Sequence, residues 1–173
     1  SKYPAGGIVF FGKNIAGPEQ LEALLSGLKQ ASNLPLMICT DEEGGSVSRI
    51  ANAAGFQVQK FDGAEAIGAT GDPHEAYRMG QVIGAYLNRY GFNLDFAPVA
   101  DINSDPEHII IGSRAFGSDA QTVSSMVNAM IDGLHDGGVM ACIKHFPGHG
   151  AASGDSHDGY VELDKSWACL LYT

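Results

Sequence analysis

Residues 144–157 bring lysine, histidine and carboxylate side chains together in one short stretch. Lys144 and His145 directly follow an apolar run, and Asp155 and His157 stand two residues apart. A carboxylate close to an imidazole can fix the tautomer of the ring and favour its protonated form. Because imidazoles titrate near neutral pH, this pair of residue types is suited to general acid–base catalysis. The alternative interpretation is that Asp155 and His157 are solvated loop residues.

Polar side chains also follow three earlier apolar runs of the sequence. Lys13 follows the first run, and Asp41, with Arg49 further along, follows the second. Asp95 and Asp101 lie within and after the third run. In a parallel α/β protein the carboxyl ends of all strands share one face. The sequence therefore predicts one shared polar pocket in place of four separately solvated strand ends.

A metal site is the competing interpretation of the histidine-rich stretch. His145, His149, Asp155 and His157 are residue types that bind zinc. However, no histidine pair matches the helical motif of a metalloprotease, and Lys144 would repel a cation. We therefore expect no metal and no cofactor, and a metal-dependent hydrolase stays as an alternative function.

Strands that alternate with helices are predicted to position these clusters. Continuous apolar runs, typical of parallel strands buried on both faces, cover residues 7–11, 35–40, 92–100 and 139–145. Helical patterns begin at Pro18, at Asp72-Pro73 and at Asp119. This alternation predicts βαβ units and an α/β fold with a parallel sheet. Residues 49–69 lack a clear period and are predicted to form a long functional loop.

The composition limits the function classes. The chain has 173 residues, 45% of them hydrophobic, which suits a single domain with a core. Its formal net charge of −10 argues against a nucleic-acid partner and, less strongly, against an anionic membrane surface. No apolar run approaches the roughly 20 residues of a transmembrane helix. We expect a cytoplasmic location, and a secreted one is the alternative because a removed signal leaves no trace.

Five stretches of the sequence carry a family resemblance. They are residues 6–14, residues 41–45 with Arg49, residues 96–101, residues 112–117 and residues 144–157. Together they resemble glycoside hydrolase family 3, specifically its β-N-acetylglucosaminidases, and Asp-Ser-His at 155–157 is typical of that branch.

The resemblance implies a catalytic (β/α)8 barrel of the TIM type. It also implies removal of terminal N-acetyl-β-D-glucosamine, with retention of configuration, from peptidoglycan-type fragments. By similarity, His157 would be the general acid/base and Asp155 would orient it. The residues that would hold the sugar hydroxyls and the acetamido group are Asp41, Arg49, Arg114, Lys144 and His145.

The sequence also departs from the family pattern. Only about four βα units can be counted, and the family's first strand is not matched. We expect the family's nucleophilic Asp to lie beyond Thr173, so residues 1–173 would form a partial barrel domain that is inactive alone. A non-catalytic sugar-binding remnant is the alternative. Open sheet edges and an uncovered apolar face predict a homo-oligomer.

Overall fold

A computed structural model of the chain describes residues 4–104, 110–152, 154, 157–162 and 166. Its centre is a four-stranded parallel sheet in the order β1-β2-β5-β6. The strands are β1 (Gly7–Phe10), β2 (Met37–Thr40), β5 (Leu94–Asp95) and β6 (Met140–Ala141). Each lies inside one of the predicted apolar runs, so the α/β class and the parallel sheet are confirmed. The division of the parent protein into domains stays a prediction.

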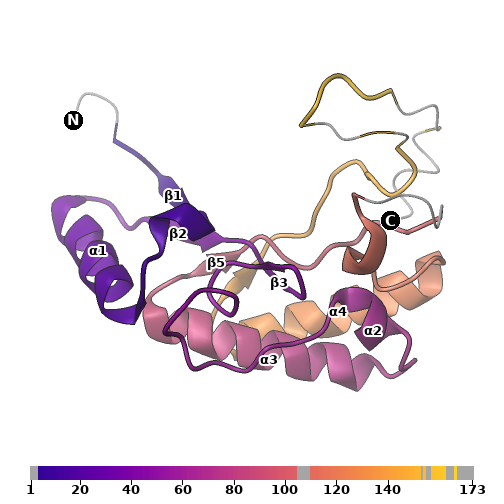
Figure 1. The fold of residues 1–173 in the computed structure, drawn as a ribbon, viewed down its shortest axis with the longest axis horizontal. Coiled ribbons are helices and arrows are strands. Elements are labelled where there is room, and N and C mark those ends of the chain that lie inside the picture. Colours follow the sequence, from indigo (N-terminus) through magenta and orange to yellow (C-terminus); the bar gives the residue numbers. More distant parts are fainter. Residues whose placement is uncertain (1–3, 105–109, 153, 155–156, 163–165, 167–173) are drawn as a thin grey trace.

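Three long helices separate the strands along the chain (Figure 1). They are α1 (Pro18–Ala31), α3 (Pro73–Tyr90) and α4 (Ala120–Asp136). The predicted N-caps form as expected: Asp72 accepts a hydrogen bond from the backbone N–H of His74 at 3.0 Å, and Asp119 accepts one from Thr122 at 2.9 Å. None of the described helices is both long and apolar enough to cross a membrane.

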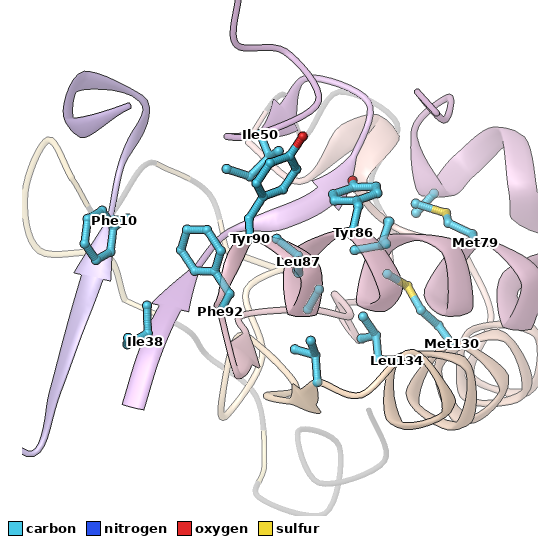
Figure 2. Packing of buried hydrophobic residues seen from close by; sticks show 14 of the residues in the cluster. Phe10, Ile38, Ile50, Met79, Tyr86, Leu87, Tyr90, Phe92, Met130 and Leu134 are labelled. Atoms are coloured by element: carbon cyan, nitrogen blue, oxygen red, sulfur yellow. The ribbon is translucent and has the colours of Figure 1, made fainter. Parts of the chain in front are cut away.

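The hydrophobic core lies between the sheet and its helices. Met79 and Leu87 of α3 pack with Met130 and Leu134 of α4, which runs beside α3 (Figure 2). Near β1 and β2, Phe10 meets the ring of Phe92 edge-on, with ring centroids 5.8 Å apart. These contacts fix the strands against the helices, so the carboxyl ends of the strands are held at constant positions.

The segment predicted as a long loop is more ordered than its composition suggests. The residues just before it form an antiparallel hairpin of β3 (Glu42–Gly44) and β4 (Val47–Ser48). Within the segment itself, a short helix, α2, covers Ala64–Gly68. The expectation of a loop over 49–69 was therefore wrong in part. A five-residue helix is too short to show a hydrophobic period, and Gly68 of α2 lies directly against the carbonyl of Phe116.

The structure also contains two single turns of 3-10 helix. The turn η1 (Gly12–Asn14) follows strand β1, and η2 (Gly112–Arg114) precedes α4. The turn η2 matters for the site because it carries Arg114. Both turns are too short for a sequence pattern to reveal them.

The two faces of the sheet differ in burial. Ile8, Phe10 and Ile38 point to the helices and belong to or border the core. Val9, Met37 and Met140 lie on the opposite face and keep 40%, 39% and 43% of their surface exposed. Burial on both faces was expected from the continuous apolar runs. In the part of the chain that the structure describes, this second face is only partly covered, since Cys39 on it is buried while the three residues above are exposed.

Candidate functional site

The residues that follow β2 form the centre of the site. Asp41, Glu42 and Glu43 are consecutive, yet their carboxylates have different partners. Because successive side chains of an extended chain point to opposite sides, Glu42 turns inward while its two neighbours turn to the strand-end rim. One acidic run therefore supplies one structural carboxylate and two site carboxylates.

Glu42 anchors the hairpin to the core. Its carboxylate accepts hydrogen bonds from the backbone N–H groups of Ile50 and Ala51, at 2.8 and 2.9 Å, and from the Tyr86 hydroxyl at 2.8 Å. Burial raises the pKa of Glu42, and these donors partly counteract that effect. The contacts hold the backbone immediately after Arg49, which lies beside the site.

Lys144 connects two site carboxylates. Its Nζ donates to Asp41 Oδ1 at 2.7 Å and also pairs with Glu43 Oε1. Arg49 approaches the other oxygen of Asp41, with Nη2 and Oδ2 3.5 Å apart. Lys144 follows β6 and Asp41 follows β2, so the predicted convergence occurs for these two strand ends. Asp95, predicted to join the same pocket, is instead fully buried within β5.

Arg114 completes this network from η2. Its Nε and Nη2 both donate to the Glu43 carboxylate at 2.8 Å, a two-pronged pairing that fixes the guanidinium plane. Its Nη1 donates to the carbonyl of Ile110 at 3.1 Å. The hydrogen bonds to Glu43 raise the pKa of Arg114, so its positive charge is secure.

His145 joins the same network through Asp101. The His145 Nδ1 lies 2.5 Å from Asp101 Oδ2, and its Nε2 lies 3.3 Å from Arg114 Nη2. The other Asp101 oxygen accepts the backbone N–H of His149 at 2.5 Å. Burial alone would raise the pKa of Asp101, but these hydrogen bonds outweigh it and lower the pKa. The Lys144–His145 peptide bond is cis.

The assembled site is a ring of fixed charges at the carboxyl ends of the strands. Its carboxylates come from Asp41, Glu43 and Asp101, and its cations from Arg49, Arg114 and Lys144. Such paired donors and acceptors, largely buried but partly accessible at one rim, suit a ligand with many hydroxyl groups. Among the described residues, no group of three or more histidine, cysteine, aspartate or glutamate side chains is placed to hold a metal ion.

Comparison with known proteins places this chain in a family. The model of the glycosyl hydrolase family 3 N terminal domain matches residues 1–170. The chain belongs to the glycosyl hydrolase family 3 N-terminal domain family. It is 37% identical, over 95% of its length, to beta-hexosaminidase A of Pseudoalteromonas piscicida.

Two solved family 3 structures share the fold of this chain. A β-N-acetylglucosaminidase from Paenibacillus sp. str. FPU-7 is 40% identical, with a TM-score of 0.82 over 88% of this chain and 29% of its own. NagZ from Neisseria gonorrhoeae, in complex with N-trifluoroacetyl-D-glucosamine, is 32% identical, with a TM-score of 0.85 over 95% of this chain and 48% of its own. The chain spans 28% and 47% of two curated relatives, less than half of either.

The family 3 chain brings together five of the residues that the sequence singled out, namely Asp41, Arg49, Arg114, Lys144 and His145. Their roles in ligand binding stay predictions. Asp155 lies outside the described residues, so its pairing with His157 stays a prediction as well, and His157 itself is exposed.

Sequence reasoning missed two members of the network. Glu43 was seen only as part of an acidic run. Asp101 was seen as a strand-end carboxylate, and no partner was predicted for it. Both are almost fully buried, with 4% and 1% of the side chain exposed. Asp101 directly follows an apolar run, where a carboxylate is costly to bury without a partner, and this was the available signal for that residue.

Proposed function

We propose that the protein containing this chain hydrolyses terminal N-acetyl-β-D-glucosaminides, and that the rim described above holds the terminal sugar. The observation that carries the proposal is the network of Asp41, Lys144, Glu43 and Arg114 at the strand ends. The names of the relatives support it, since they are β-hexosaminidases and a β-N-acetylglucosaminidase. Peptidoglycan-type fragments are the proposed source of the sugar.

Each rim residue has a proposed part in holding the sugar. Asp41 accepts hydrogen bonds from sugar hydroxyls, while Lys144 and Arg49 hold that carboxylate in place and donate to neighbouring sugar oxygens. Arg114 and His145 bind on the other side of the rim, next to the acetamido group. Glu43 touches two of the cations and holds them apart at a fixed spacing.

The proposed chemistry is a double displacement with retention of configuration. A carboxylate nucleophile bonds to the anomeric carbon as the glycosidic C–O bond breaks, and protonated His157, oriented by Asp155, gives its proton to the departing oxygen. Neutral His157 then takes a proton from water, and the water oxygen bonds to the anomeric carbon. The bond between that carbon and the nucleophilic carboxylate breaks, which releases the sugar. The nucleophile is the family aspartate expected beyond Thr173, so we expect this chain to bind the sugar without turning it over.

Calorimetric titration of the chain with N-acetylglucosamine tests the proposal. We expect saturable binding, which Lys144→Met weakens by at least about tenfold because it leaves two carboxylates without their shared cation. Lys29→Met, on the exposed last turn of α1, is the matched control and should bind as the wild type does. An absence of saturable binding, or an undiminished affinity of Lys144→Met, would overturn the proposal.

Turnover of an aryl N-acetyl-β-glucosaminide separates the hydrolase from the sugar-binding alternative. We expect none from this chain, and turnover once the protein also contains the chain segment carrying the nucleophile. Binding without turnover in that longer protein would favour a non-catalytic sugar-binding function.

A further inference from the structure

Asp101 uses its two carboxylate oxygens for two different donors. Oδ2 faces the ring nitrogen Nδ1 of His145, and Oδ1 accepts the backbone N–H of His149. The carboxylate is 1% exposed, so water does not compete for either contact. Asp101 therefore connects the segment after β5 with the segment after β6 at two points.

The contacts of His145 determine which of its nitrogens carries the proton. A guanidinium group only donates hydrogen bonds, so the His145 Nε2 that faces Arg114 Nη2 must present its lone pair. A neutral imidazole has one N–H, which then resides on Nδ1, where Asp101 accepts it. Arg114 and Asp101 thus select the same tautomer from opposite sides of the ring.

We propose that Asp101 is a positioning residue that holds His145 as the Nδ1–H tautomer, so that Nε2 faces Arg114 and the strand-end rim as an acceptor. The same carboxylate holds the segment that carries the ring, through the N–H of His149. Close packing supports this position: a Cβ on Gly150 would lie 2.0 Å from the carbonyl oxygen of Ile102. Asp101 therefore acts on both the position of the ring and its tautomer, the latter together with Arg114.

The substitution Asp101→Asn separates this role from simple space filling. The backbone N–H of His149 can only donate, so the amide oxygen of the new side chain must face it. The amide NH₂ group then faces His145 Nδ1 and requires a lone pair there. The ring proton is forced onto Nε2, where it opposes a donor of Arg114. An asparagine side chain has nearly the same shape as aspartate, yet at position 101 it favours the opposite tautomer of His145.

Long-range ¹H–¹⁵N correlation spectra of the labelled chain, recorded above the ordinary titration range of imidazole, test the assignment directly. The six histidines are distinguished by the loss of one signal set in His145→Gln. We expect a protonated Nδ1 in the wild type and a protonated Nε2 in Asp101→Asn. The matched control is Asp95→Asn, at a buried carboxyl group of β5 whose Oδ1 accepts the backbone N–H of Glu42, and it should keep the wild-type pattern.

Two outcomes would overturn the proposal: a wild-type ring protonated on Nε2, or an Asp101→Asn ring that keeps its proton on Nδ1. The wild-type spectrum decides even if Asp101→Asn fails to fold. A second measurement rests on the proposed function, because it follows N-acetylglucosamine affinity, which should fall about tenfold in Asp101→Asn. If the wild type binds no sugar, the proposed function fails while the tautomer assignment is still tested by the spectra.

Discussion

At the scale of single residues, the site depends on carboxylates that differ in what surrounds them. Asp101 is ionised because two donors face it, while Asp95 is fully buried with one donor, the backbone N–H of Glu42 at 2.9 Å. The Asp95 Oδ2 atom has no hydrogen-bond partner among the described residues. Burial raises the pKa of Asp95 well above its ordinary value, so folding favours the neutral form of this side chain.

Asp95→Asn should therefore be tolerated. The amide oxygen can keep the bond to Glu42, and the NH₂ group replaces an oxygen without a partner. A carboxyl whose pKa is raised by folding weakens stability as pH climbs above its unfolded pKa, because the unfolded state releases the proton first. The free energy of unfolding of the variant, from urea titrations, should match or exceed that of the wild type at neutral pH.

The pH series checks the sign of this effect. The difference between variant and wild type should vanish toward the unfolded pKa of about 4 and grow as pH rises. Asp101→Asn is the contrasting variant, since folding lowers the pKa of Asp101 and its ionised form stabilises the native state. An Asp95→Asn protein that is less stable than the wild type at every pH would contradict the assignment of Asp95 as a neutral acid.

At the scale of elements, glycine contacts set how closely the helices approach. A Cβ on Gly80 of α3 would lie 2.3 Å from the carbonyl oxygen of Met130 in α4, and one on Gly133 would lie 2.1 Å from that of Tyr77. These approaches place α3 and α4 in direct backbone contact. Because α3 also carries Tyr86, which binds Glu42, the helix pair supports the hairpin beside the site.

Gly80→Ala should destabilise the protein by about 2 kcal/mol, because the backbone of α4 cannot yield as a flexible side chain would. The matched control is Gly27→Ala in α1, where a Cβ meets nothing within 4 Å. That variant should gain about 0.5 to 1 kcal/mol from the better helix propensity of alanine. Urea denaturation measures both changes, and equal effects of the two substitutions would contradict the close helix contact.

Elements with local sequence signals could be predicted from the sequence, whereas elements that depend on tertiary contacts could not. The caps at Asp72 and Asp119 and the apolar runs have local signals, so the helix starts and strand positions were predicted correctly. The hairpin after Asp41 and the short helix α2 depend on contacts with distant segments. The pairing of Asp101 with His145 is also tertiary, since 44 residues separate the two, and no spacing rule could have revealed it.

At the scale of the whole molecule, one face of the sheet is covered by helices and the opposite face is partly open among the residues that the structure describes. Strands β1 and β6 are its outer strands, and Val9, Met37 and Met140 expose an apolar surface opposite the helices. Exposed apolar faces and unpaired strand edges both favour association with another chain. We therefore expect the isolated chain to associate with itself, with two copies covering each other's open sheet faces.

The double substitution Val9→Lys with Met140→Lys should shift the isolated chain toward a monomer, because two charges would have to be buried in the contact. Multi-angle light scattering at micromolar concentrations measures the change in mass. Leu24→Lys is the control: Leu24 is an exposed apolar residue of α1, away from the open sheet face, and its replacement should leave the mass of the assembly unchanged. A wild-type chain that is monomeric throughout this concentration range would show that the open face does not drive association.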